Sequence, residues 1–498
     1  MCKDIFMIVD KNNKLRFIFL VSIIFLLPFL DFVNNNFNEI NIILGASFYL
    51  LIVLQGILLI SISFLIFLIF KNKINFWECL LISTLINWFL FKHHLLNLEI
   101  EKYFNNEYSS ELSLFLIILL TSLVILLLLK KNEFIKKFIN IFFIILFVLT
   151  SFEVLSKLYK SQNQFETNSN IKMNFIYKDN LKLAKENIYY FILDGMQPIE
   201  DFEKYYDVEL KEFLSLVRNN KYSYIQNSKN YYGNTIHDVS ALFYLDKIFL
   251  NREKEIFKEN TNISFPVLMR HTEKSNLMVN LKNLDYNFKW LGNFFAYCPK
   301  YNLRFCLDKK GKFFIDTYLY INFFRQTPII QITWNIASFF NYDFNKNFFF
   351  KLNDGIGRLH SYLEKNNNLI VKNKPTFYFI HHMSPHWPYL TDSNCNYQYF
   401  PGKANIEGYK NAYLCNLNRI IQMINFLNLK DPNAIVIFQS DHNGELTKHI
   451  PGELRKIFNL VKLGENCLIN ESVNMSNVNT MRLVLSCITG NKVIYLND

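Results

Sequence analysis

Long apolar runs occupy the first third of the chain. Runs of about 18 or more apolar residues match the hydrocarbon core of a bilayer. The pattern therefore predicts five membrane-spanning helices, the third of them shorter than the rest, at Leu15–Val33, Asn41–Phe70, Phe76–Phe91, Leu112–Leu129 and Phe138–Leu155. A cleaved signal peptide is the alternative for the first run, but its apolar core is long and no small-residue cleavage site follows it.

Lys and Arg are distributed unequally among the short loops between these runs. The N-terminus, the loop after the second run and the loop after the fourth run are basic, as in KKNEFIKK at Lys130–Lys137. By contrast, Asp31–Ile40 has no Lys or Arg, and His93–Glu111 has only Lys102. Because cytoplasmic loops are enriched in positive charge, we expect the N-terminus in the cytoplasm. Five spans then place everything after Leu155 outside.

The pattern changes after Leu155. Residues 156–185 are polar, without a clear period, and indicate a linker. Beyond them, short apolar runs alternate with helical patterns such as 201–218 and 408–426. Three of the runs resemble strands buried on both faces, as in parallel sheets: NIYYFILDG at Asn187–Gly195, PTFYFIHH at Pro375–His382 and AIVIFQSDH at Ala434–His442.

These patterns predict three parts of the chain. They are an α-helical transmembrane domain at 1–155, a linker at 156–185 and an exported α/β domain with a mostly parallel central sheet at 186–498. Within the last part, Phe313–Phe350 is dense in Phe, Tyr and Ile, but its charges and Pro328 argue against a span. An interfacial segment lying on the membrane and a helical insertion packed on the domain remain equal alternatives.

Cysteine usage agrees with export. An even number of cysteines in an oxidising compartment suggests disulfides, and we expect pairs between sequence neighbours, Cys298–Cys306 and Cys395–Cys415. Buried free thiols are the alternative, and the absence of C-x-x-C argues against a cysteine zinc site. The six cysteines of the predicted exported part are Cys298, Cys306, Cys395, Cys415, Cys467 and Cys487.

The net charge of +11 reflects in part the basic cytoplasmic loops. The exported part is also Lys-rich, which fits a solvated surface or a surface near anionic lipid head groups. No basic motif indicates nucleic acid, so we expect no nucleic-acid partner.

Each of the three predicted strands ends in ionisable residues. They are Asp194, then His381 and His382, then Asp441 and His442. In open α/β sheets, ligands bind beyond the carboxyl ends of the strands. Two carboxylates and one imidazole suit a divalent metal such as Zn²⁺, Mn²⁺ or Mg²⁺. Singly, each aspartate is equally suited to cap a turn, and the histidines to fill the core.

A candidate nucleophile lies in the stretch KNYYGNTIHDVSALFYLD, residues 229–246. Thr235 follows a Gly-Asn turn and precedes an apolar helical run, so its hydroxyl would lie near a helix N-terminus, where anions are favoured. A metal beside this hydroxyl would lower its pKa and activate it for attack. The alternative is that Thr235 only caps the helix.

Four motifs, in this order along the chain, resemble those of the alkaline phosphatase superfamily: LDG ending at Gly195, GNT ending at Thr235, H-x-x-x-P-H-x-P from His381 to Pro388, and SDH ending at His442. The set is most similar to the sulfatase-like membrane branch, which includes phosphoethanolamine and phosphoglycerol transferases with several N-terminal spans. The resemblance covers about residues 186–498, and the five-span layout also fits.

The resemblance implies roles for individual residues. Asp194, Asp441 and His442 would be metal ligands, and Thr235 would be both the nucleophile and a further ligand. His386 matches the histidine that contacts the transferred group, and His381 matches a second recurrent histidine. A second metal at His237 and Asp238 has no firm match.

Two departures limit what the resemblance implies. The head-group transferases usually carry Glu where this chain has Asp194, and an Asp-Gly with a Thr nucleophile is also similar to nucleotide pyrophosphatases and phosphodiesterases. Sulfatases need Cys or Ser in C/S-x-P-x-R, which CPKYN at Cys298 lacks. Sulfate-ester hydrolysis is therefore not expected.

The expected activity is transfer of a phospho-head-group from a membrane lipid donor to a surface glycan or lipid, through a phosphothreonine intermediate. The expected protein is a monomer in the inner membrane with a periplasmic catalytic domain. A hydrolase with the same site, acting as a phosphodiesterase or phosphatase, is the main alternative. A degenerate, non-catalytic relative is a third, against which the intact Asp194, Thr235, Asp441 and His442 argue.

Overall fold

The computed structural model divides the chain into two compact units. Unit 1 comprises residues 1–170 and 315–340, and unit 2 comprises residues 171–314 and 341–498. The structure describes residues 11–35, 46–70, 76–91, 120–122, 124–125, 133–167, 186–247, 275–291, 323, 343, 346, 349–366, 374–402, 404–444, 453–464, 467–470 and 472–497.

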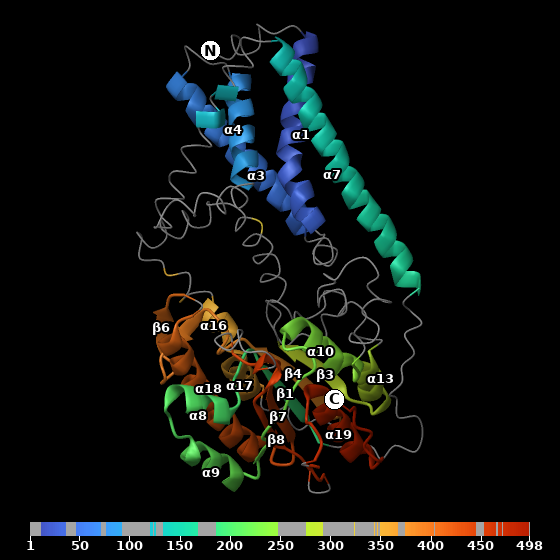
Figure 1. The fold of residues 1–498 in the computed structure, drawn as a ribbon, viewed down its shortest axis with the longest axis vertical. Coiled ribbons are helices and arrows are strands. Elements are labelled where there is room, and N and C mark those ends of the chain that lie inside the picture. The colour runs from blue at the N-terminus through green and yellow to red at the C-terminus, as the bar shows by residue number, and fades with distance from the viewer. Residues whose placement is uncertain are drawn as a thin grey trace. The chain divides into compact units, whose positions relative to one another are not determined.

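Long apolar helices make up the described part of unit 1 (Figure 1). They are α1 (Lys11–Asn35), α3 (Ala46–Phe70), α4 (Phe76–Phe91) and α7 (Glu133–Thr167). Four of the five predicted spans fall on these helices, and the fourth, Leu112–Leu129, lies mostly outside the described residues. Among those residues, two helices are long and apolar enough to cross a membrane, at Ile52–Ile69 and Lys137–Lys157, whereas Ile18–Asn34 and Phe76–Phe91 are shorter apolar helices.

Two features of unit 1 differ from a simple division of the chain at Leu155. Helix α7 continues to Thr167, so the first part of the predicted linker is helical. Part of the aromatic segment Phe313–Phe350 groups with unit 1. Its described residue Phe323 is buried and packs its ring against Phe29 and Phe91, with centroids 4.9 and 4.5 Å away.

A six-stranded mixed sheet forms the centre of unit 2, and it is mostly parallel, as predicted. Its order is β2-β8-β7-β1-β4-β3, and β7, β1, β4 and β3 run parallel, while β8 and β2 pair antiparallel. The three strands expected from the sequence are the adjacent central ones. The strands are β1 (Ile188–Leu193), β2 (Ser223–Tyr224), β3 (Asn287–Leu291), β4 (Thr376–His382), β7 (Ile435–Ser440) and β8 (Asn459–Lys462).

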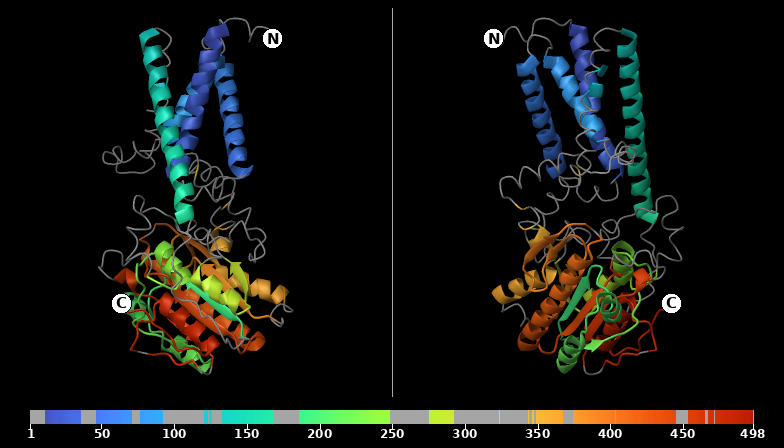
Figure 2. Two further views of the ribbon diagram at one scale, coloured as in Figure 1. Left: turned by 90° about the vertical axis from the view of Figure 1, so that its right-hand side faces the viewer. Right: turned by 60° about the vertical axis from the view of Figure 1, so that its left-hand side comes forward.

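Helices cover both faces of this sheet (Figures 1 and 2). Alternate residues of β1 point to opposite faces, because the side-chain period of a strand is two. Tyr189 and Phe191 belong to one buried cluster, and Tyr190 and Ile192 belong to another. The first cluster includes α8 (Ile199–Tyr206), α9 (Lys211–Asn219), α17 (Gly355–Lys365) and α18 (Ile406–Lys430), and the second includes α10 (Thr235–Tyr244), α13 (Asn276–Asn283) and α19 (Asn477–Thr489).

The helical pattern at 201–218 forms two helices rather than one. Helix α8 ends where Asp207 takes a left-handed conformation, with φ of 49°, and α9 begins at Lys211. Short polar side chains such as Asp adopt this conformation more readily than most. The pattern at 408–426 forms a single helix, α18, as predicted.

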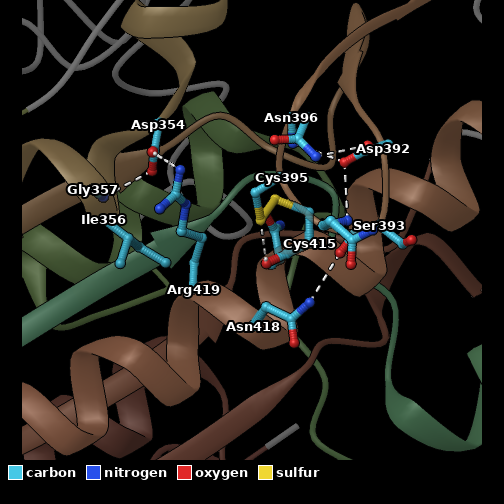
Figure 3. The surroundings of a disulfide bond; sticks show 12 residues. Asp354, Ile356, Gly357, Asp392, Ser393, Cys395, Asn396, Cys415, Asn418 and Arg419 are labelled. Carbon is cyan, nitrogen blue, oxygen red and sulfur yellow. Dashed lines mark hydrogen bonds and ion pairs between the residues drawn. A yellow bond between two sulfur atoms is a disulfide. The ribbon is translucent and has the colours of Figure 1, made fainter.

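A hairpin of β5 (Tyr389–Thr391) and β6 (Tyr397–Phe400) is attached to α18 by a disulfide (Figure 3). Cys395 is bonded to Cys415, which confirms that prediction. The Asn418 side chain also donates to the Ser393 carbonyl. A second disulfide joins Cys467 to Cys487. Cys298 and Cys306 lie outside the described residues. Two short elements complete the described part, α16 (Phe350–Asn353) and the 3-10 turn η7 (Glu453–Arg455).

Candidate active site

The candidate site lies where the three central strands end. Leu193, the last residue of β1, pairs with His382 on one side and with Ser440 on the other. Asp194 and Asp441 therefore emerge next to each other at the carboxyl edge of the sheet. The parallel register of β1 and β7 thus makes neighbours of Asp194 and Asp441, which are 247 positions apart in the sequence.

Asp194, Asp441 and His442 form one buried cluster, as predicted. One ligand atom from each lies within 4.8 Å of the others. The Nε2 atom of His442 lies 3.4 Å from Asp194 Oδ1 and 3.7 Å from Asp441 Oδ2. The side chains of both aspartates are 1% exposed or less. Two carboxylates and one imidazole thus face one small volume.

Three carboxylate oxygens of this cluster have no hydrogen-bond partner within the described part of the chain. They are both oxygens of Asp194 and Oδ2 of Asp441. The other Asp441 oxygen accepts from the backbone N–H groups of Gly195 and His442, at 3.1 and 2.9 Å. Asp441 therefore caps the turn with one oxygen and faces His442 with the other, which accepts no hydrogen bond from the described residues. Because unsatisfied buried polar atoms are costly, these oxygens fit the ligand set of a divalent cation.

The electrostatics of the cluster favour positive charge. Burial alone would raise the pKa of Asp194, but the charge of His386 and the contacts of His381 and His442 outweigh it and hold the pKa below its usual range. Burial would lower the pKa of His442, but Asp441 and Asp194 outweigh it and raise the pKa to about 10. Asp194 is thus held as an anion, and its charge draws a cation to the site.

The histidines of the H-x-x-x-P-H-x-P motif have different surroundings. His381 Nε2 lies 3.2 Å from Asp194 Oδ2, but neither ring nitrogen has an aligned hydrogen-bond partner among the described residues. His386 lies beside the cluster, with its ring centroid 6.5 Å from that of His442. The structure therefore brings both predicted substrate-binding histidines beside the cluster of Asp194, Asp441 and His442.

His382 is a core histidine instead. Its Nδ1 atom accepts from the Ile356 N–H at 3.3 Å, and its Nε2 atom lies 3.0 Å from Asn416 Oδ1. Since Nδ1 accepts, Nε2 carries the proton and donates to Asn416. Both ring nitrogens are engaged in hydrogen bonds within the core, so His382 is not available to the site.

Gly195 is required at the turn after β1. Its φ is +68°, a conformation that other residues rarely adopt. A Cβ atom there would lie 3.5 Å from the His442 ring, which is ordinary contact. The glycine is therefore needed for backbone conformation, and it lets the chain turn while its N–H bonds Asp441.

Thr235 is the first residue of α10 and is half-buried. The capping role belongs to Asn234, whose side chain accepts from the His237 N–H at 3.0 Å, so Thr235 is not needed as the cap. The loop before it is joined to the end of β7, because the Asn230 amide donates to the Asp441 carbonyl at 2.6 Å.

Asp238 has a structural role in this loop and is not placed to bind a second metal. Its carboxylate accepts from four consecutive backbone N–H groups, from Tyr231 to Asn234, at 2.7–3.2 Å. Burial outweighs these bonds and raises the pKa of Asp238 to about 7, and the charge of Asp441 adds to the rise. Sequence reasoning missed this role and that of Asn230, because neither residue lies at a strand end.

No family model and no curated protein matches the sequence. The chain is similar to the C-terminal periplasmic domain of EptC from Escherichia coli in complex with Zn, with 14% identity over 58% of this chain and 75% of that chain, and a TM-score of 0.35.

Two further solved structures extend this likeness. One is the integral membrane lipooligosaccharide phosphoethanolamine transferase EptA from Neisseria meningitidis, with 14% identity over 88% of this chain and 72% of that chain, and a TM-score of 0.36. The other is YidJ from Bacteroides fragilis, described as a sulfatase, with 12% identity over 64% of this chain and 81% of that chain, and a TM-score of 0.36.

The structures matched are phosphoethanolamine transferases and sulfatases. These are the kinds of protein that the four motifs resemble. At such identities and TM-scores, no residue role and no activity is carried over to this chain.

Proposed function

We propose that the chain is a membrane-anchored, metal-dependent phosphotransferase that moves a phospho-head-group from a lipid donor to a cell-surface glycan or lipid. One observation carries the proposal. At the carboxyl edge of the sheet, Asp194, Asp441 and His442 converge in a buried cluster, and three of its carboxylate oxygens accept no hydrogen bond from the described residues. Such a cluster has little value as packing, because replacing it by apolar groups would remove the cost of burying it.

Asp194, Asp441 and His442 would hold the cation, and Thr235 would complete the ligand set. When bound, Zn²⁺, Mn²⁺ or Mg²⁺ supplies Lewis-acid stabilisation of the phosphoryl oxygens and lowers the pKa of a neighbouring hydroxyl. The N-terminus of α10 adds backbone N–H groups, which favour the negative charge of the phosphoryl group. His386 and His381 are proposed to contact that group from the β4 side.

In the proposed first step, Thr235 Oγ1 attacks the donor phosphorus. A bond forms between this oxygen and phosphorus, and the bond between phosphorus and the diacylglycerol oxygen breaks. The hydroxyl proton of Thr235 passes to the departing diacylglycerol oxygen, which leaves as an alcohol. The head group stays on phosphorus as a phosphothreonine diester.

In the second step, a hydroxyl of the acceptor attacks the same phosphorus. The bond between phosphorus and Thr235 Oγ1 breaks, and the acceptor's proton returns to Thr235. Splitting the transfer into two displacements is the general advantage of a covalent intermediate. A five-span domain with a periplasmic catalytic part is proposed to keep the site close to a donor in the outer leaflet.

The test is donor turnover by the full-length protein in liposomes that contain a phospholipid with a radiolabelled phospho-head-group, together with Zn²⁺ and a glycan or lipid acceptor with a free hydroxyl. The proposal predicts diacylglycerol release with the label on the acceptor. Thr235→Ala should lower turnover by more than about 10³-fold, as removal of a nucleophile does elsewhere, whereas Thr235→Ser should retain part of it. If the label appears only in a water-soluble hydrolysis product and not on the acceptor, the protein is a hydrolase instead. Undiminished turnover by Thr235→Ala would exclude Thr235 as the nucleophile.

A further inference from the structure

Asn230 occupies a buried position between the metal-site strand and the nucleophile loop. It is 0% exposed. Its Nδ2 atom donates to the carbonyl of Asp441 at 2.6 Å and lies 3.4 Å from the carbonyl of Ser440. Its Oδ1 atom accepts from the Asn477 N–H at 2.9 Å. The side chain therefore bonds the two backbone carbonyls that flank the Cα atom of Asp441. It also bonds the first turn of α19.

The backbone of Asn230 is fixed as firmly as its side chain. Its N–H donates to the Arg455 carbonyl at 2.7 Å, and its own carbonyl accepts from Arg455 Nε at 2.7 Å. The same 3-10 turn contacts the SDH loop, because the Leu454 carbonyl accepts from the Asn443 N–H at 3.0 Å. Asn230 thus has a defined place relative to both Asp441 and the residues that follow it.

Only four residues, 231 to 234, separate Asn230 from Thr235, and hydrogen bonds hold the loop that they form. Asp238 accepts from the N–H groups of Tyr231 to Asn234. Gly233 has a φ of +76° and packs so closely on Leu454 that a Cβ atom would lie 3.0 Å from the Leu454 Cβ atom. Because every residue of this loop is held in place, the position of Asn230 at its start determines the position of Thr235 at its end.

We propose that Asn230 is a positioning residue, whose amide fixes the Thr235 loop against Asp441 so that the nucleophile and the metal-binding carboxylate keep one relative position. The effect of this positioning on catalysis rests on the proposed function, but the structural coupling between the Thr235 loop and Asp441 does not. A residue that orients a metal site without touching the metal typically contributes about 10- to 100-fold to metal affinity or to activity.

The matched control is Asn479. It is also 0% exposed, and its side chain makes three hydrogen bonds to backbone, at 2.8–2.9 Å, with Asn474 and Leu496. It lies on the same helix that Asn230 contacts. One of its partners, Leu496, belongs to the C-terminal segment, and the other, Asn474, pairs with the backbone of Lys229 and not with β7. Asn230→Ala and Asn479→Ala therefore remove equally buried amides, and only one of them touches the metal-site strand.

A milder variant removes a single bond of Asn230. Asn477 is the first residue of α19, where proline is tolerated. The residue before it, Ser476, has φ of −60° and ψ of 168°, which is compatible with a following proline. Asn477→Pro deletes the N–H that Asn230 Oδ1 accepts, and it keeps the inference testable if Asn230→Ala does not fold.

The first readout needs no activity. Hydrogen–deuterium exchange is measured on the full-length protein in detergent, for peptides that cover 230–238 and 440–444. Asn230→Ala and, more weakly, Asn477→Pro should speed exchange in both peptides together, whereas Asn479→Ala should change neither. Unchanged exchange in either peptide of Asn230→Ala, or in both peptides of Asn477→Pro if Asn230→Ala does not fold, would overturn the coupling.

The second readout links the coupling to function. Zn²⁺ affinity by chelator competition and the rate of Thr235 modification should each fall about 10- to 100-fold in Asn230→Ala and stay near wild type in Asn479→Ala. Equal values in the two variants would overturn the positioning role. If exchange responds as expected but wild-type protein neither binds Zn²⁺ nor modifies Thr235, the proposed function fails while the coupling stands.

Discussion

Asp194→Asn is the most informative single change, because the carboxylate and the amide have nearly the same shape. Asp194 contributes two of the three oxygens in the cluster that accept no hydrogen bond from the described residues. Asparagine keeps one oxygen acceptor and replaces the other by an NH₂ group, which cannot bind a cation. The site therefore loses one unit of negative charge and one ligand atom while its packing is kept.

The magnitude of the effect differs with and without metal. Metal-free protein holds two carboxylates against one imidazolium, so removal of one charge should change the free energy of unfolding by only about 1–2 kcal/mol. Metal affinity should fall by more than about 100-fold, since a lost ligand matters more than a lost outer contact, and about 100-fold corresponds to about 2.8 kcal/mol. The variant should thus be close to wild type in chelator and clearly less stable in Zn²⁺.

The assay is Zn²⁺ titration of the purified full-length protein by chelator competition, with thermal unfolding recorded at each end point. Asp431→Asn is the control, because Asp431 lies near the opposite end of β1 and accepts from Asn187 and Tyr189, at 2.7 and 3.0 Å. Asp431→Asn should bind Zn²⁺ like wild type. Equal Zn²⁺ affinity in Asp194→Asn and wild type would refute the assignment of Asp194 as a ligand.

Three further changes separate structural from chemical roles. His382→Ala should cost about 2–4 kcal/mol of stability, because both ring nitrogens are hydrogen-bonded in the core. His381→Ala should lower the melting temperature less than His382→Ala and should lower turnover; the reverse pattern would exchange the two roles. Gly408→Ala should cost about 1–3 kcal/mol by overpacking, because a Cβ atom there would lie 2.6 Å from the β5–β6 hairpin; a wild-type melting temperature would show that the hairpin yields. Cys395→Ser should cost about 3 kcal/mol of stability, as expected for a disulfide that closes a loop of 20 residues. Reductant should lower the melting temperature of the wild type more than that of the variant, whereas an equal response would assign the loss to another disulfide.

The sequence was most informative where a periodic or ordered pattern existed. Apolar runs that end in Asp194, His382 and Asp441 predicted three buried parallel strands, and these are the adjacent central strands β1, β4 and β7. Because parallel strands share one carboxyl edge, the convergence of the ionisable residues followed from the strand prediction.

Two features had no local signal. The antiparallel pairing of β8 depends on long-range register, which short strands do not encode by themselves. The functions of Asn230 and Asp238 depend on which backbone groups the fold brings to them, so their residue types alone gave no indication. His382 and His381 also looked equivalent in sequence, and only their burial against different elements separates them.

Peptide mass spectrometry of the Thr235 peptide tests the central claim most directly. Full-length protein purified from its own membranes would be digested after brief exposure to a lipid donor and Zn²⁺, with Thr235→Ala as the control. The account predicts a phosphoryl-linked adduct on Thr235, whose mass names the transferred head group, and no adduct in chelator. A bare Thr235 in protein that binds Zn²⁺ and turns over the donor would contradict the covalent mechanism.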